Sequence, residues 1–155
     1  MIINTSNLSE SPKLFSGKES ASILGLESDQ MIHPKTPIRY DLQARYVKGK
    51  ALIEGILEVE LSCRCSRCAE LFSKVIHIPS FSRSYQITTE NHLIDLTGDI
   101  REDILLAFPM NIVCSSFCKG LCPYCGTNLN KQECSCNKEK RKSEWEILDQ
   151  LKLST

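Results

Sequence analysis

Nine cysteines are the side chains of this 155-residue chain best suited to chemistry. Six of them fall within one window of 23 residues: Cys114, Cys118, Cys122, Cys125, Cys134 and Cys136. At its centre, Cys122-Pro123-Tyr124-Cys125 is a Cys-x-x-Cys turn, which brings two thiolates to one edge of a tetrahedral metal site, and Gly126 relaxes the backbone after it. Clustered thiols of this kind predict a structural zinc site.

The four ligands of one zinc ion are expected to come from five cysteines: Cys118, Cys122, Cys125, Cys134 and Cys136. Cys122 and Cys125 are the firmest choices because they form the Cys-x-x-Cys pair. The other three compete for the two remaining places, and Cys114 ranks behind them. The window holds no histidine, so the predicted site is all-thiolate.

Two other chemistries use the same residues. Iron–sulfur clusters also take thiolates, but a repeated Cys-x-x-Cys-x-x-Cys run is absent. Cys-Pro-Tyr-Cys is also a dithiol redox motif, which would make the protein an oxidoreductase. That motif opens a helix in a βαβ unit, whereas Gly126 and Asn128 oppose a helix start and only 30 residues follow Cys125. Zinc is therefore preferred.

A second cysteine group, Cys63, Cys65 and Cys68, lies earlier in the chain. Cys65-Ser66-Arg67-Cys68 either completes the metal tetrahedron with Cys122 and Cys125 or forms a tight hairpin turn whose thiols pack. Free cysteines are often small buried apolar residues. We favour the turn.

A basic run follows the cysteines directly, made of Lys138, Lys140, Arg141 and Lys142. Such a run is either a solvated face or, beside a zinc module, a contact for RNA phosphates. An acidic cluster, made of Asp95, Asp99, Glu102 and Asp103, is interpreted as favourable charge at a helix N-terminus rather than a carboxylate active site. The three histidines are isolated, and we expect surface or edge positions for them.

The elements that position these residues follow from hydrophobic periodicity. Apolar residues alternate over residues 38–46 and 53–61, which predicts a hairpin closed at Lys48-Gly49-Lys50. Further extended runs cover residues 71–78 and 81–87. Asp99 and Glu102 form a capping-box-like start for a helix that Pro109 ends. A second helix is expected from Ser143, with Trp145, Leu148 and Leu151 on one face.

This pattern predicts an α+β fold: an antiparallel β-sheet or partly closed barrel with a few helices and a C-terminal zinc-binding cysteine module. We expect a polar, loosely ordered arm over residues 1–35 and a β-rich core with one helix over residues 36–112. The cysteine module and C-terminal helix would occupy residues 113–155.

Composition limits the class of protein. Lys plus Arg equals Asp plus Glu, at 19 each, so bulk charge does not indicate a nucleic-acid binder. The first residues lack the basic and apolar regions of a signal peptide, and no stretch approaches the roughly 20 apolar residues of a membrane span. The expected location is cytoplasmic, where thiols stay reduced and favour metal chemistry over disulfides.

The order of motifs closely resembles the YceD family, the large ribosomal RNA subunit accumulation proteins of bacteria. The segments that carry the resemblance are Cys63-Arg64-Cys65-Ser66-Arg67-Cys68, Ile94-Asp95-Leu96-Thr97, residues 100–109, residues 118–130 and Cys134-Ser135-Cys136. The longest contains Lys119-Gly120-Leu121-Cys122-Pro123-Tyr124-Cys125-Gly126-Thr127-Asn128-Leu129-Asn130, which is far more specific than a bare Cys-x-x-Cys. The resemblance runs from about Ile38 to the Trp145 helix, and departs at Phe108 and Met110, where plainer aliphatic residues are expected.

The resemblance implies a non-enzymatic factor in synthesis, processing or accumulation of large-subunit (23S) ribosomal RNA, supporting ribosome biogenesis. The implied partner is that RNA, bound directly or through an assembly protein, with no membrane and no small-molecule substrate. Family members vary in the cysteine module, so zinc would be structural support. The alternatives are a zinc-stabilised protein-interaction module and the dithiol oxidoreductase.

Overall fold

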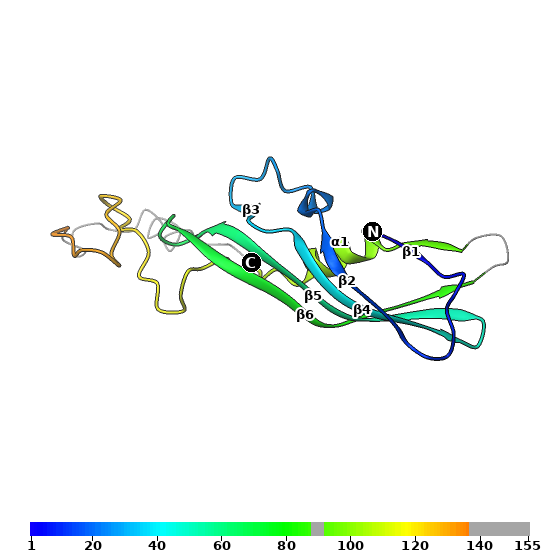
Figure 1. Cartoon of the computed structure of the whole chain (residues 1–155). Helices are drawn as coiled ribbons and strands as arrows, with labels where there is room; N and C mark the ends of the chain where they lie inside the picture. The colour runs from blue at the N-terminus through cyan, green and yellow to red at the C-terminus, as the bar shows by residue number, and fades with distance from the viewer. Residues whose placement is uncertain (88–91, 137–155) are drawn as a thin grey trace, which may run out of the picture.

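A long antiparallel hairpin is the main structural element of the molecule (Figure 1). The computed structural model describes residues 1–87 and 92–136. β5 (Lys50–Arg64) and β6 (Leu71–Gln86) pair from Lys50↔Gln86 to Arg64↔Leu71, which leaves a short turn around Cys65 and Cys68 at one end. The hairpin therefore carries the first cysteine group at its tip.

Three more strands extend this sheet. β4 (Ile38–Val47) pairs with the first half of β5, β2 (Lys13–Glu19) pairs with β4, and β3 (Ile32–Pro34) pairs with the end of β5. All pairings are antiparallel. Within the described residues β2 and β6 do not meet, so the sheet is open and the partly closed barrel is wrong.

The strands expected at residues 38–46 and 53–61 are confirmed, and positive φ at Lys48 (48°) and Gly49 (84°) closes the turn between them. The two runs expected at 71–78 and 81–87 are instead one strand, β6. Between the pairs Leu57↔Ile78 and Gly55↔Phe81, β6 has one residue more than β5. This β-bulge accommodates Pro79, which has no N–H for the ladder.

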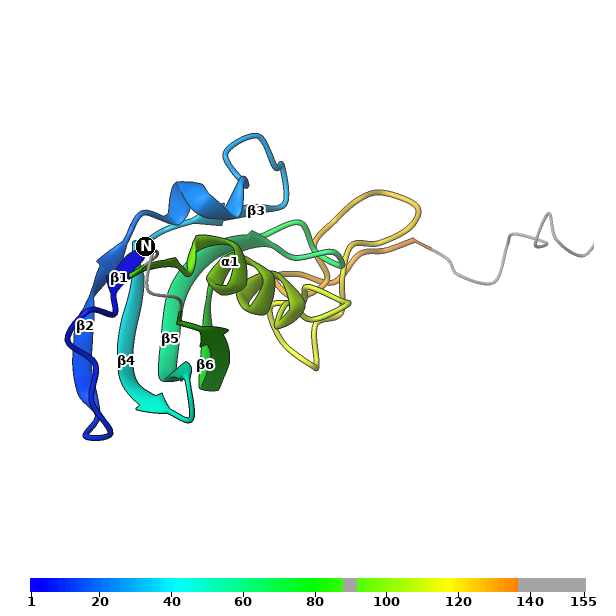
Figure 2. The same ribbon diagram turned by 90° about the vertical axis from the view of Figure 1, so that its right-hand side faces the viewer.

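One face of the curved sheet is covered by α1 (Thr97–Leu106), as Figure 2 shows. β1 (Ile2–Asn4) pairs with β7 (Leu93–Asp95) as a separate two-stranded ribbon. The side chains that meet between the helix and the sheet have no exposed surface, and include Ile53, Leu57, Phe81, Ile100 and Ile104. Apolar burial at this contact fixes α1 on the sheet.

Residues 1–35 differ from the loosely ordered arm that the sequence predicts. They form β1, β2, β3 and a 3-10 helix, η1 (Ala21–Leu24). Ile3 and Leu24 belong to the buried core. Each of these short strands is held by a partner that is distant in the sequence, and such pairing leaves little local signal. The expected division into three segments stays a prediction, and the helix expected from Ser143 lies outside the described residues.

The predicted capping box at the start of α1 is wrong. The helix begins at Thr97, whose N–H donates to Asp95 Oδ1 at 2.9 Å. Asp99 lies in the first turn but accepts hydrogen bonds from Arg83 Nε (2.9 Å) and from the Tyr85 hydroxyl on β6. Arg83 Nη2 also donates to Asp103. Part of the acidic cluster thus joins the helix to β6, and no carboxylate active site is formed by this pair.

No helix among the described residues has both the length and the apolar character needed to cross a bilayer.

Replacing Arg83 with methionine should lower the free energy of unfolding by about 1–3 kcal/mol, because Asp99 and Asp103 would lose a partly buried cationic donor. Arg39→Met is the matched control, since the Arg39–Glu58 pair is more exposed and is expected to contribute less than about 1 kcal/mol. Urea unfolding followed by circular dichroism measures both. Equal losses of unfolding free energy in the two variants would contradict the expectation that Arg83 stabilises the contact between α1 and β6.

Candidate metal centres

Eight of the nine cysteines form two groups of four. Tetrad 1 comprises Cys65, Cys68, Cys114 and Cys118, and tetrad 2 comprises Cys122, Cys125, Cys134 and Cys136. Within each tetrad all four sulfur atoms lie within 4.8 Å of one another. None of the nine cysteines forms a disulfide. The structure thus brings together two metal-ligating sets where the sequence analysis expected one.

The sulfur spacing fits a tetrahedral ion. The distance is 3.8 Å between the Cys65 and Cys118 sulfurs and 3.7 Å between those of Cys68 and Cys114. Four sulfurs placed about 2.3 Å from a central zinc have a tetrahedral edge of about 3.8 Å. The donor set of tetrad 1 therefore fits zinc in both chemistry and dimension.

The hairpin turn positions one half of tetrad 1. Cys65 donates its N–H to the Glu70 carbonyl at 2.9 Å, and this bond closes the turn between β5 and β6. The next residue, Ser66, donates its N–H (2.8 Å) and its hydroxyl (3.0 Å) to the Ile112 carbonyl. These two bonds hold the chain that leads to Cys114 and Cys118 against the turn. Cys65 and Cys68 therefore form a turn and also half of a candidate metal-binding set, which is completed by Cys114 and Cys118 rather than by Cys122 and Cys125.

The same local turn occurs in both tetrads. The residue after each Cys-x-x-Cys donates its N–H to the carbonyl of the first cysteine at 2.9 Å, from Ala69 to Cys65 and from Gly126 to Cys122. Both residues have left-handed backbone, with φ of 59° at Ala69 and 72° at Gly126. The third residue of each turn points its N–H at the first sulfur, at 3.4 Å from Arg67 and 3.5 Å from Tyr124.

Hydrogen-bond donors in tetrad 1 favour thiolate at two of its sulfurs. Burial acts to raise the pKa of the Cys65 thiol, but the backbone N–H groups of Cys68, Cys114 and Arg67 together lower it to about 6. The Asn130 amide donates to the Cys118 sulfur at 3.4 Å and lowers its pKa. Burial and the neighbouring sulfurs raise the pKa of Cys114 to about 12.

In tetrad 2, as in tetrad 1, the thiol pKa is lowered at some sulfurs and raised at others. The Thr127 side chain, 3.2 Å from the Cys125 sulfur, and the Thr127 N–H lower the pKa of Cys125 to about 6. The neighbouring Cys125 sulfur and burial raise the pKa of Cys136 to about 12. Four sulfurs this close repel one another as thiolates, so only part of each set ionises without a cation. A divalent ion would stabilise all four thiolates.

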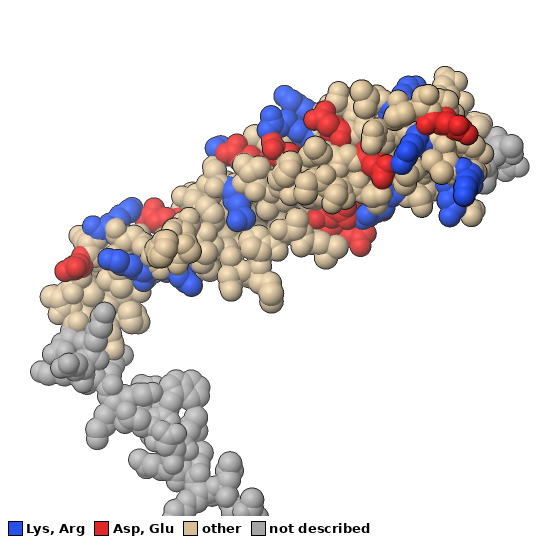
Figure 3. Space-filling view, turned by 90° about the horizontal axis from the view of Figure 1, so that it is seen from below, with Lys and Arg blue, Asp and Glu red and all other residues tan. Residues whose placement is uncertain are grey.

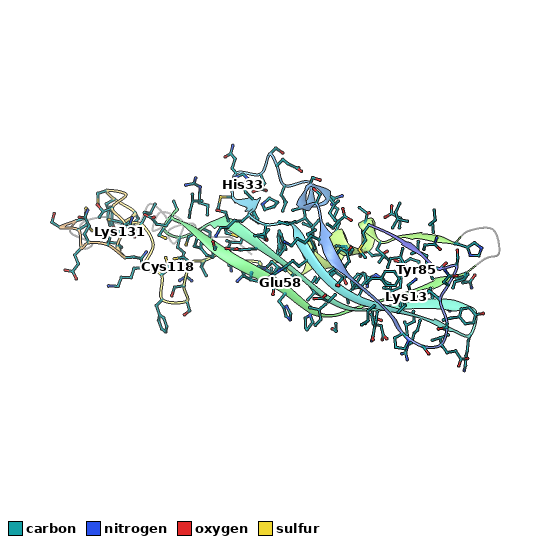
Figure 4. The ribbon with its side chains drawn as sticks, viewed as in Figure 1. Lys13, His33, Glu58, Tyr85, Cys118 and Lys131 are labelled. Atoms are coloured by element: carbon teal, nitrogen blue, oxygen red, sulfur yellow. The ribbon has the colours of Figure 1, made fainter. Side chains whose placement is uncertain are left out.

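Tetrad 2 is attached to tetrad 1 through the backbone. Leu121 donates its N–H to the Arg67 carbonyl at 3.0 Å, and Leu129 donates to Gly120 at 2.9 Å. Lys131 pairs with Glu70 at 2.6 Å. Figure 4 shows Cys118 and Lys131 at the end of the molecule opposite Tyr85. We call this part, residues 63–70 and 112–136, the cysteine end.

The remaining predicted residues lie elsewhere. Cys63 is buried in the main core opposite Ile32, away from both tetrads. The three histidines are exposed. The basic run of Lys138, Lys140, Arg141 and Lys142 lies outside the described residues. The sequence analysis considered Cys65 and Cys68 as a half-site but favoured a packed turn, and ranked Cys114 last, whereas the structure places all three in one set of four sulfurs with Cys118.

The residues that follow the two Cys-x-x-Cys turns offer a matched pair of substitutions. Gly126→Ala should destabilise tetrad 2 by about 1–2 kcal/mol, because a side chain is strained at φ 72° even though the space around it is open. Ala69→Gly removes the same strain at tetrad 1, and should be neutral or stabilise by up to about 1 kcal/mol. Thermal unfolding of both variants with metal bound measures the effects. A loss in both would show that strain at these residues is not the controlling factor.

Comparisons with known proteins agree on one family. The family model for the large ribosomal RNA subunit accumulation protein YceD matches residues 53–152. A chloroplastic YCED homolog 1 of Arabidopsis thaliana, named as such an accumulation protein, is 25% identical over 80% of this chain and 52% of its own length. The corresponding protein of Zea mays is 26% identical over 66% of this chain and 50% of its own length.

An uncharacterised protein of Mycobacterium leprae is 29% identical over 71% of this chain and 57% of its own length. The chain thus spans about half the length of the curated relatives it matches. No solved structure matches it. The family match covers more than half of the chain, and includes most of the hairpin, α1 and both tetrads. This chain therefore belongs to the YceD family of large ribosomal RNA subunit accumulation proteins.

Proposed function

We propose that this chain is a non-catalytic factor in the synthesis, processing or accumulation of large-subunit ribosomal RNA. The observation that carries the proposal is the family match, together with two plant relatives named for accumulation of this RNA. The partner is the large-subunit RNA, reached directly or through an assembly protein. The protein would thereby support ribosome biogenesis.

The arrangement of reactive groups supports a non-catalytic role. Asp99 and Asp103 are engaged by Arg83, and Glu58 is engaged by Arg39. The dithiol motif does not open a helix, because Gly126 turns the chain into the left-handed region directly after it. Cys122 and Cys125 also lie beside Cys134 and Cys136 in a closed set of four sulfurs. A dithiol oxidoreductase needs an accessible, unshared pair.

Each tetrad is proposed to hold one structural zinc ion. Soft thiolate donors suit zinc, and four protein ligands leave no open position for a substrate. Cys118 then serves tetrad 1, while Cys122, Cys125, Cys134 and Cys136 form the set closest to the site expected from the sequence. When bound, the ion would cross-link segments that share few apolar contacts, and its binding free energy would contribute to folding.

RNA contact is proposed for the basic run of Lys138, Lys140, Arg141 and Lys142. Its first residue follows Cys136 by two positions in the sequence. Each cation that meets a phosphate releases a counterion, and binding should therefore weaken as salt rises.

The direct test is sequencing of the RNA that is cross-linked to the protein in its own cells. Large-subunit ribosomal RNA should be enriched over small-subunit ribosomal RNA, and changing Lys140, Arg141 and Lys142 together to alanine should reduce the yield. A triple change of Lys13, Lys18 and Lys50, which lie on the strands of the sheet, is the matched control. Absence of enrichment would favour the alternative of a protein-interaction module that acts on an assembly protein.

A further inference from the structure

An aromatic side chain is held in solvent between two cysteines of tetrad 1. Phe117 is 89% exposed. Its loop, Ser115-Ser116-Phe117, has Cys114 and Cys118 at its two ends. Ser115 Oγ accepts the Phe117 N–H at 3.2 Å within the loop. Because both ends belong to one tetrad, the exposure of the ring is set by a short closed loop rather than by a free chain end.

Two cations belong to the segments next to this loop. Arg67, on the hairpin turn, donates from Nη1 to the Cys118 carbonyl at 3.3 Å, so its guanidinium lies beside the peptide that joins Cys118 to Lys119. Lys119 comes next in the chain and is exposed. It has no ion pair within residues 1–87 and 92–136. We call Arg67, Phe117 and Lys119 the tip surface.

Acidic residues are few around the tip surface, and the exposed Glu133 shares a surface hollow with Lys119. Residues 104–132 contain no Asp and no Glu, although the whole chain contains 19 acidic residues. The nearby Glu70 of the hairpin turn accepts from Lys131 (2.6 Å) and from Asn128 (3.2 Å). Figure 3 shows acidic side chains mixed with basic ones over the sheet and fewer acidic ones at the cysteine end. Of the two carboxylates that the structure describes near this end, Glu70 is paired with Lys131, so a polyanion approaching Lys119 meets mainly the carboxylate of Glu133.

We propose that the tip surface binds unpaired RNA, with a base stacked on the Phe117 ring and with Arg67 and Lys119 against the flanking phosphates. This inference rests on the proposed function, and adds a contact surface separate from the basic run. Sequence-tolerant recognition of single-stranded RNA uses aromatic rings beside cations. An aromatic anchor for a protein partner is instead centred among residues that exclude water. The loop neighbours of Phe117 are Ser115, Ser116 and Lys119, which are polar and exposed.

The small number of cations at the tip surface predicts RNA binding that depends only weakly on salt concentration. Four thiolates around a divalent ion leave a formal charge of about −2, so the tip surface is not strongly electropositive. Only two cations face the RNA in this account. For two phosphate contacts on a single strand, the slope of log K against log salt should contribute about −1.4, well below that of a highly basic interface. Stacking should carry most of the affinity.

The test uses the full-length chain as purified and a fluorescein-labelled single-stranded RNA of about 12 nucleotides, followed by fluorescence anisotropy. Phe117→Ala should weaken binding by roughly 5- to 150-fold, the range measured for loss of one stacked base. Phe117→Trp should retain binding, and Phe117→Leu should lose as much as Phe117→Ala. Leu14→Ala is the matched control, since Leu14 is also largely exposed (79%) but lies on β2. Metal content and melting temperature should be unchanged in all four.

Three results would overturn the tip surface: Phe117→Ala binding like the unchanged chain, Phe117→Leu binding like Phe117→Trp, or a probe with abasic nucleotides binding as tightly as the intact RNA. Depletion of the protein from its cells separates this inference from the proposed function. If depletion lowers large-subunit ribosomal RNA while Phe117→Ala binds normally, only the tip surface fails. If depletion leaves that RNA unchanged, the proposed function fails.

Discussion

The mutual repulsion of clustered thiolates is the constraint on which the cysteine end depends. Its apolar cluster consists of Cys65, Cys68 and Cys118 with only Phe72 and Val113 packed against them. The sheet and α1, by contrast, share a continuous core that includes Ile53, Phe81 and Ile104. Hydrophobic burial can therefore hold the sheet and α1 together, but the apolar cluster of the cysteine end is too small to do the same there. A cation bound by the four thiolates of a tetrad would supply the folding free energy that the small apolar cluster does not.

The sheet and its contacts with α1 position the two segments that carry the cysteines of tetrad 1. Arg83 and Tyr85 on β6 hold Asp99 of α1, and the chain leaving the helix reaches Ile112, whose carbonyl accepts from Ser66. The long β5–β6 hairpin thereby delivers two cysteines to the place where the chain after α1 delivers two more. Tetrad 2 then rests on the hairpin turn through the Arg67 carbonyl. The hairpin turn and the chain that follows α1 set the sulfur positions of tetrad 1, and the loops between the cysteines add exposed surface.

The local sequence pattern was sufficient to predict the elements in which apolar residues recur at a regular spacing. The sequence predicted the alternation in β4 and β5, the turn at Lys48-Gly49 and the presence of a helix before Pro109. Three short strands within residues 1–35 were not, because their partners are remote in the sequence. The role of Asp99 depends on Arg83, a residue of another element. Spacing revealed two Cys-x-x-Cys half-sites but could not show which cysteines complete each one, since Cys68 and Cys114 are 46 residues apart.

The most direct test of this account is the metal content of the intact chain, measured by native mass spectrometry and checked by elemental analysis. Two zinc ions per chain should be present, and Cys114→Ser should lose the ion of tetrad 1 while Cys136→Ser should lose the ion of tetrad 2. A chain that holds no metal, or that melts at the same temperature after complete removal of zinc by a chelator, would contradict the claim that the cysteine end is built on thiolate–metal bonds.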